Sequence, residues 1–78
     1  MNYSYNDDMD IKETVGNNLR LARQAKGMTQ KQVAAVLKKY QPDYSQYETG
    51  RIELDYEKIV ALCKLLDTTP NELFEGLF

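Results

Sequence analysis

The chain has 78 residues, a formal net charge of −2, one cysteine and no histidine. This length suits one small domain, the single cysteine excludes an internal disulfide, and the lack of histidine argues against a structural zinc site, so we expect no metal and no cofactor. The apolar stretches are far shorter than the roughly 20 residues that span a bilayer, and the cysteine content suits a reducing compartment, so we expect a cytoplasmic protein with no membrane partner.

The first helix is predicted over residues 10–26. Residues 1–9 before it are polar and acidic without a helical period, and we predict a flexible arm there. Asp10 can cap the start of the helix, and Gly27 can end it by adopting a positive φ. The apolar residues recur at helical spacing, at Ile11, Val15, Leu19 and Ala22.

Two short helices are predicted next. The helix over residues 29–39 begins with a capping box formed by Thr29 and Gln32. The helix over residues 42–49 begins with Pro42, which is tolerated in a first turn, and ends at Gly50. Their inward-facing residues are predicted to be Val33, Val36, Leu37, Tyr44 and Tyr47, and Tyr56 is grouped with these tyrosines.

The last two helices are predicted over residues 56–66 and 70–76. Asp55 can cap the first, and Thr69 can cap the second, which has a proline in its first turn. Their apolar faces comprise Ile59, Leu62, Cys63 and Leu66, then Leu73, Phe74, Leu77 and Phe78. Five short helices leave no room for a sheet, so we predict a compact all-α domain over residues 10–78.

The short turn between the second and third helices permits two interpretations. The third helix can project into the major groove of DNA, or the pair can be a plain helical hairpin. Residues 15–51 carry a net charge of +5, whereas residues 1–14 carry −3 and residues 52–78 carry −4. A positive segment suits a polyanionic partner, but it is also common on solvated surfaces. No histidine base and no glycine-rich phosphate loop is present, so we predict no enzyme.

The same region carries a specific residue pattern. The pattern comprises Leu21, Arg23, Gly27, Met28, Thr29, Gln30, Val33 and Ala34, then Tyr44, Ser45, Tyr47, Glu48, Gly50 and Arg51, then Leu62, Leu65, Leu66, Glu72, Leu73 and Phe74. Over residues 15–74 this resembles the phage-repressor and Cro type of helix-turn-helix protein, the XRE family. The resemblance implies a lambda-repressor-like fold with the helix-turn-helix at the second and third helices. It also implies double-stranded DNA as partner and no small-molecule ligand.

The resemblance also assigns roles to individual residues. The expected phosphate contacts are Gln30, Lys31, Lys39 and Arg51. The expected base contacts are Gln41, Pro42, Asp43, Ser45 and Gln46. Gln30 is further expected to orient a base-reading side chain, and Arg23 with Glu48 is expected to form a structural ion pair.

Several residues depart from the family pattern. Lys38 stands where the family has a turn glycine, and Tyr40 stands where it has a small cap residue. Asp43 either accepts a hydrogen bond from a cytosine amino group or caps its helix. Glu53 and Asp55 fall where basic residues would help DNA binding, whereas Tyr40 is the tyrosine considered for DNA contact.

Two functions follow from these observations. The first is a sequence-specific transcriptional regulator, a repressor or controller protein, that binds a two-fold operator as a homodimer. Its expected dimer interface is Phe74, Leu77 and Phe78, because an exposed apolar patch usually marks an interface, although this tail can also fold back on the first helix. The alternative is a protein-interaction module with the same fold that has lost most DNA binding.

Overall fold

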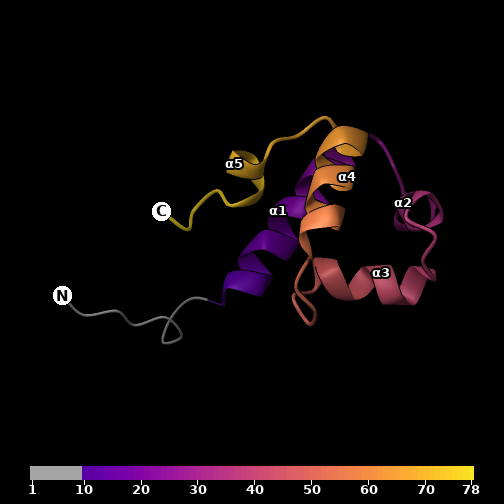
Figure 1. Cartoon of the computed structure of the whole chain (residues 1–78), viewed down its shortest axis with the longest axis horizontal. Helices are drawn as coiled ribbons and strands as arrows, with labels where there is room; N and C mark the ends of the chain where they lie inside the picture. The colour runs from indigo at the N-terminus through magenta and orange to yellow at the C-terminus, as the bar shows by residue number, and fades with distance from the viewer. Residues whose placement is uncertain (1–9) are drawn as a thin grey trace.

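The computed structural model describes residues 10–78, so the predicted arm over residues 1–9 lies outside the described residues. Five helices follow one another along the chain (Figure 1): α1 (Ile11–Ala25), α2 (Gln30–Val36), α3 (Gln41–Glu48), α4 (Tyr56–Leu66) and α5 (Pro70–Leu73). No strand occurs in residues 10–78, and the predicted all-α architecture is confirmed. Within the same residues, no helix combines the length and the apolar character needed to cross a bilayer.

Four of the five helices, α1, α2, α4 and α5, begin where a side chain accepts a hydrogen bond from a free backbone N–H group. Asp10 and Asp55 each accept from a backbone N–H three residues on, at 3.2 and 2.8 Å. Thr29 and Thr69 begin α2 and α5 with complete capping boxes. These starts agree with the sequence because capping is a local interaction.

Two helices end earlier than their apolar patterns predict. α2 ends at Val36 rather than at residue 39, because Lys38 adopts a left-handed conformation with φ of 57°. α5 ends at Leu73 rather than at residue 76, and Gly76 has a φ of 93°. A left-handed residue therefore sets the end of α2, whereas α5 is already ended at Phe74, which has a φ of −99°, before the chain reaches Gly76.

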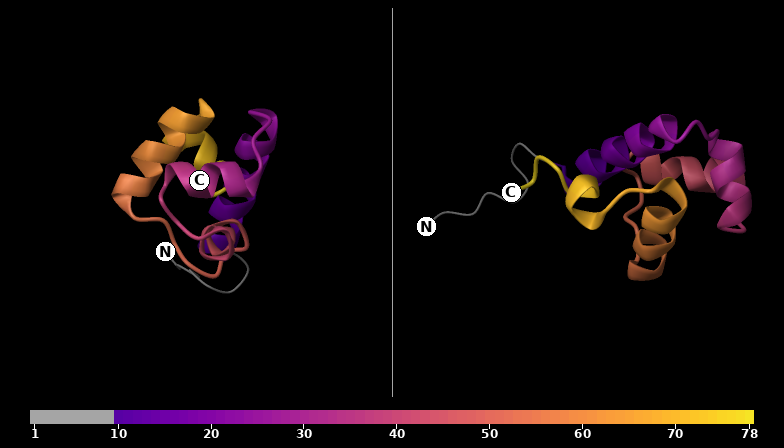
Figure 2. Two further views of the ribbon diagram at one scale, coloured as in Figure 1. Left: turned by 90° about the vertical axis from the view of Figure 1, so that its right-hand side faces the viewer. Right: turned by 90° about the horizontal axis from the view of Figure 1, so that it is seen from above.

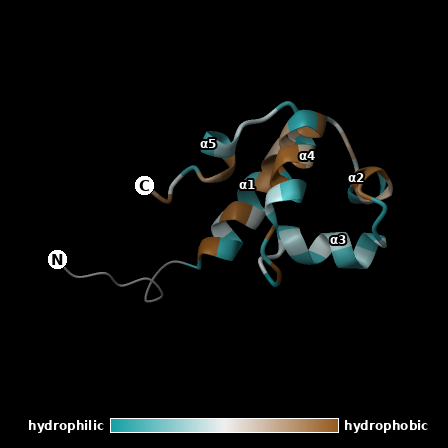
Figure 3. Cartoon of the chain, in the orientation of Figure 1, coloured by the Kyte–Doolittle hydropathy of each residue, from teal (hydrophilic) through white to brown (hydrophobic). Residues whose placement is uncertain are grey.

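All five helices contribute side chains to the core, and Figure 2 shows the arrangement of these helices from two further sides. The core is made of buried aliphatic and tyrosine side chains: Leu19, Val33, Ala34, Tyr44, Tyr47, Leu62, Leu66 and Leu73. The rings of Tyr44 and Tyr47 meet edge to face at 6.1 Å. Gly16 lets α1 approach α3 closely, since a Cβ at this position would lie 2.4 Å from the carbonyl oxygen of Tyr47. Along α3 the hydropathy is mostly low (Figure 3), so its buried side depends on tyrosines.

Two expectations for the core were wrong, those for Val36 and Tyr56. Val36 is 55% exposed, because α2 ends there and directs Val33 and Ala34 inward instead. Tyr56 is 88% exposed, since it is the first residue of α4 and that end of the helix projects from the other helices (Figure 2). Ile59 and Cys63 pack against the core but remain half-buried.

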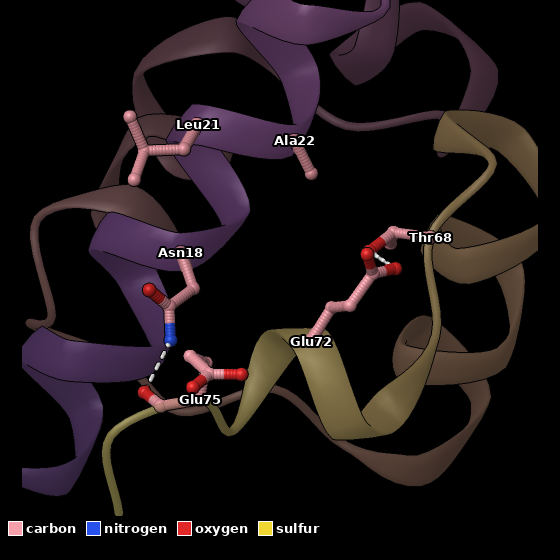
Figure 4. Close-up of a pocket in the computed structure, with 6 residues that line it drawn as sticks. All are labelled: Asn18, Leu21, Ala22, Thr68, Glu72 and Glu75. Carbon is pink, nitrogen blue, oxygen red and sulfur yellow. Dashed lines mark hydrogen bonds between the residues drawn. The ribbon is translucent and has the colours of Figure 1, made fainter.

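A side-chain clasp holds α5 against α1. The Nδ2 of Asn18 donates to the carbonyl oxygens of Leu73 and Glu75 at 2.8 and 3.0 Å, which satisfies groups left free at the end of α5. Figure 4 draws the bond to Glu75. Beside this clasp is a recess of about 340 Å³ that also contains Glu72. Its carboxylates make this side of the domain unsuitable for a polyanion.

Candidate nucleic-acid interface

The turn between α2 and α3 sets the two helices against each other (Figure 1). The N–H groups of Lys38 and Lys39 donate to the carbonyls of Ala35 and Ala34 at 3.1 and 2.9 Å, which closes α2. Lys38 makes the reversal with a positive φ, so it takes the conformation expected for a turn glycine. Tyr40 then precedes α3 without a side-chain capping bond and is 73% exposed.

A buried carboxylate ties α1 to the C-terminal end of α3. Glu48 is only 6% exposed, and its Oε2 accepts from the Nε of Arg23 at 2.6 Å. The Nη2 of Arg23 donates to Oε1 of the same carboxylate at 3.1 Å, and its Nη1 donates to the carbonyl of Met28. The hydroxyl of Tyr44 donates to Oε2 at 2.6 Å. The expected ion pair is therefore present and bidentate, the geometry that orients both groups best.

The surroundings of Glu48 keep it ionised. Burial by itself would raise the pKa of Glu48, but hydrogen bonds from Arg23, Tyr44 and Gln30 outweigh it and hold the pKa below its ordinary value. The pKa of Arg23 is raised, chiefly by its hydrogen bond to Glu48. Burial and the bond to Glu48 also raise the pKa of Tyr44, so its hydroxyl stays protonated and donates.

The same carboxylate sets the direction of two amide side chains. The Nε2 of Gln30 donates to Glu48 Oε1 at 2.9 Å, because an ionised carboxylate can only accept. The Oε1 of Gln30 therefore faces the other way and accepts from the Nε2 of Gln41 at 2.7 Å. Gln41 is left with its own Oε1 and one N–H available beyond this chain of bonds. We call the chain from Glu48 through Gln30 to Gln41 the amide relay.

The remaining expected base contacts lie along α3, away from its buried tyrosines. Pro42 and Asp43 are exposed, whereas Ser45 and Gln46 are half-buried. Asp43 lies in the first turn of α3, where the helix dipole favours a negative charge. In the described residues 10–78, no side-chain hydrogen bond caps the start of α3. Asp43 therefore stabilises this end of the helix only through its charge.

Most of the expected basic contacts gather near the N-terminal end of α3. A recess of about 430 Å³ between α2 and α3 is lined by Lys31, Lys39, Tyr40, Gln41 and Pro42 together with two alanines. Lys31 is exposed, whereas Lys39 is half-buried, with its Nζ 5.7 Å from the centre of the Tyr47 ring. Arg51 is exposed at the other end of α3 and lies outside this recess.

Comparison with known proteins identifies the family to which this chain belongs. A family described as a helix-turn-helix domain matches residues 14–75. The chain belongs to this helix-turn-helix family. It is also 34% identical, over 59 residues, to an uncharacterized HTH-type transcriptional regulator, YqaE, of Bacillus subtilis (strain 168). That alignment covers 76% of this chain and 51% of YqaE, so the chain spans about half the length of this relative. No solved structure matches the chain.

The match decides between the two interpretations of α2 and α3. They are the helix-turn-helix of a DNA-binding domain rather than a plain hairpin, and the family is not one of enzymes. Within residues 10–78, no group of three or more possible metal-ligating side chains occurs.

Two contacts of the helix-turn-helix were missed from the sequence. The bond from Tyr44 to Glu48 was detectable, since residues four apart share one face of a helix. The bond from Gln30 to Glu48 joins residues 18 apart and carried no local signal.

At the expected dimer interface, Phe74 and Leu77 are half-buried and Phe78 is fully exposed.

Proposed function

We propose that this chain is a sequence-specific transcriptional regulator of the phage-repressor and Cro type, a repressor or controller protein that acts in the cytoplasm. It binds a two-fold operator in double-stranded DNA as a homodimer. The observation that carries the proposal is the amide relay, which holds Gln41 at the N-terminal end of α3 with a free acceptor and a free donor. Such a pair of groups fits the edge of an adenine in the major groove.

The phosphate contacts follow from position and charge. Three basic residues lie on the elements around the amide relay. Lys31 is on α2, Lys39 is in the turn between α2 and α3, and Arg51 is in the loop after α3. Gln30 completes this set, because its second N–H is free to donate to a phosphate oxygen. These four contacts place α3 in the groove but carry no sequence information themselves.

The base contacts share the accessible side of α3. Gln41 and Ser45 are four residues apart, as are Pro42 and Gln46, so each pair lies on one face of the helix. Asp43, beside them, accepts from a cytosine amino group. Two such helices related by a two-fold axis read half-sites about 34 Å apart, and Phe74, Leu77 and Phe78 join the two copies.

Asp43 is also the observation that favours the second candidate, a protein-interaction module without DNA binding. Its exposed carboxylate at the N-terminal end of α3 repels phosphate, and the whole chain has a net charge of −2. A protein surface with basic residues would accept this end of α3 instead.

Selection of bound duplexes from a random DNA pool tests the proposal. We expect enrichment of a sequence with two-fold symmetry and binding that weakens with added salt, because phosphate contacts release counterions. Failure of any duplex to bind at low salt would favour the protein-interaction module.

Variants then separate the two kinds of contact. Arg51→Ala should weaken binding to all duplexes alike, whereas Gln30→Ala should in addition relax base preference, because it releases Gln41 from the amide relay. Gln41→Ala and Gln46→Ala should each cost about 1–3 kcal/mol at particular base pairs. Lys64→Ala, an exposed lysine on α4, is the charge control and should change little. Uniform loss from all four variants would contradict the base-reading role of Gln41 and Gln46.

A further inference from the structure

An apolar groove lies at the opposite end of α3 from Gln41. It has a volume of about 230 Å³ and runs between the start of α1, the loop after α3, the start of α4 and the residue after α5. We call it the side groove and define it by Ile11, Ile52, Tyr56 and Phe74. Ile11, Ile52 and Tyr56 are 50%, 44% and 88% exposed. A small domain thus leaves three large apolar side chains in water around one concave surface, which is typical of an interaction site.

A matching apolar segment follows α5. Gly76 turns the chain with a positive φ, and after it Leu77 is half-buried and Phe78 is fully exposed. In Figure 1 this segment extends beyond α5. In the part of the chain that the structure describes, neither Leu77 nor Phe78 lines the side groove of its own molecule. One molecule therefore presents both an open groove and the kind of side chains that would fill it.

We propose that a second copy of this chain inserts Leu77 and Phe78 into the side groove and receives the same two residues in return. Phe74 lies in the groove wall and only four residues before Phe78, so groove and tail are adjacent. Adjacent complementary surfaces allow a two-fold exchange that closes on itself, rather than an open chain of molecules. This inference rests on the proposed homodimer and adds the surface that receives its tail.

The charges at the edge of the groove favour a second copy over another partner. Lys12 and Glu53 line the groove, both are exposed, and they form no ion pair with each other within residues 10–78. A two-fold axis brings Lys12 of each copy toward Glu53 of the other, so the same pairing occurs twice. A strongly basic or strongly acidic partner would satisfy one of these charges and repel the other.

The available area predicts a weak dimer. An aromatic side chain buries about 150–250 Å² when it is covered, so Tyr56 and Phe78 from both copies supply about 600–1,000 Å². Ile11, Ile52 and Leu77 add to this sum, which brings it toward the roughly 1,200 Å² at the lower limit of stable interfaces. We therefore expect dissociation in the micromolar range, with DNA holding two copies together more tightly than they hold each other.

Sedimentation equilibrium of the full chain without DNA tests this interface. The variants are Tyr56→Ser in the groove and Phe78→Ser in the tail, and each should raise the dimer dissociation constant by about tenfold or more. Both side chains are exposed in the monomer, so the fold should survive, which circular dichroism verifies. Val60→Ser is the matched control, because Val60 is 53% exposed on α4 but lies outside the groove. It should leave the dissociation constant unchanged.

Mixing the two variants separates exchange between copies from folding back within one copy. A mixed dimer retains one intact contact, from the Phe78 of the Tyr56→Ser chain to the Tyr56 of the Phe78→Ser chain. The mixture should therefore associate more tightly than either variant alone. If the tail fills the groove of its own chain, or if residues 1–9 or another protein fill it, mixing has no effect and the proposal fails.

Binding to a short random duplex at low salt keeps this test independent of the proposed function. Single copies of Tyr56→Ser and Phe78→Ser should bind such DNA as the unmodified chain does, since the amide relay and its basic neighbours are untouched. An unmodified chain that stays monomeric at near-millimolar concentration but binds DNA overturns the interface alone. A chain that dimerises through the groove but binds no DNA overturns the proposed function alone.

Discussion

Glu48 is the polar group on which we expect stability to depend most, and Glu48→Gln tests it. Its carboxylate accepts from two nitrogens of Arg23, from Gln30 and from Tyr44. Glutamine keeps the shape of the side chain but replaces one acceptor oxygen by an NH₂ group. It also removes the negative charge that balances Arg23.

The expected loss of stability depends on which hydrogen-bond partners of residue 48 can adjust to a glutamine. The hydroxyl of Tyr44 can rotate to accept, and the amide of Gln30 can turn over, but a guanidinium has donors only. The Arg23 side chain is 11% exposed, so its charge would stay mostly buried without a counter-charge. Breaking such a pair costs about 3–5 kcal/mol, and a domain of this size loses about 4–8 °C in Tm per kcal/mol. The Tm should fall by at least about 12 °C.

Urea unfolding followed by far-UV circular dichroism measures this loss. The control is Asp55→Asn, because the pair of Asp55 with Lys58 is on the surface and asparagine caps a helix as well as aspartate. It should cost less than about 1 kcal/mol. Adding Arg23→Met to Glu48→Gln should recover part of the loss, since no charge is then unpaired. An unchanged urea midpoint for Glu48→Gln would refute the argument from the buried charge.

Three further predictions concern the same scaffold. Because the pKa of Glu48 is lowered in the folded chain, its contribution is present above the unfolded value of about 4.3 and is lost as the pH falls through the folded value. Urea midpoints should thus fall on acidification, and fall less for Glu48→Gln; equal slopes would contradict this. Gly16→Ala gains about 1 kcal/mol of helix propensity, but the new Cβ lies 2.4 Å from the Tyr47 carbonyl oxygen, so we expect a net loss of about 1–2 kcal/mol in thermal unfolding. A Tm equal to or above that of the unmodified chain would show that α1 and α3 can separate freely. Asn18→Ala removes both bonds of the α5 clasp and should cost about 1–2 kcal/mol, with hydrogen exchange near Leu73 accelerated more than in α2. Uniform acceleration in both helices would instead indicate loss of global stability.

The starts of α1, α2, α4 and α5 were predictable because each depends on residues three positions apart, whereas α3 begins at Gln41 without such a bond. Asp10, Thr29, Asp55 and Thr69 all accept the capping bonds expected of them. The ends of α2 and α5 were less predictable, since apolar residues such as Leu37 and Leu77 continue the helical pattern past the point where the backbone leaves it. Local spacing cannot show where a left-handed residue intervenes.

The site was predictable only in part, because its residues come from three helices. The family pattern indicated Arg23 with Glu48 and gave Gln30 an orienting role. The structure adds that Glu48 sets the direction of the Gln30 amide, which requires α1, α2 and α3 to be in place together. Tyr56 shows the opposite error, since its aromatic ring suggested burial whereas its position at the start of α4 leaves it in water.

The left-handed Lys38 makes stability and electrostatic attraction compete at a single residue. A side chain in this conformation costs about 1–2 kcal/mol, and glycine would relieve it at an entropic cost of about 0.4–1 kcal/mol in the unfolded chain. Lys38→Gly would therefore stabilise the fold slightly while it changes the net charge from −2 to −3. In an acidic protein with only one segment of net positive charge, selection for a stronger turn and selection for attraction to a polyanion favour different residues at this position.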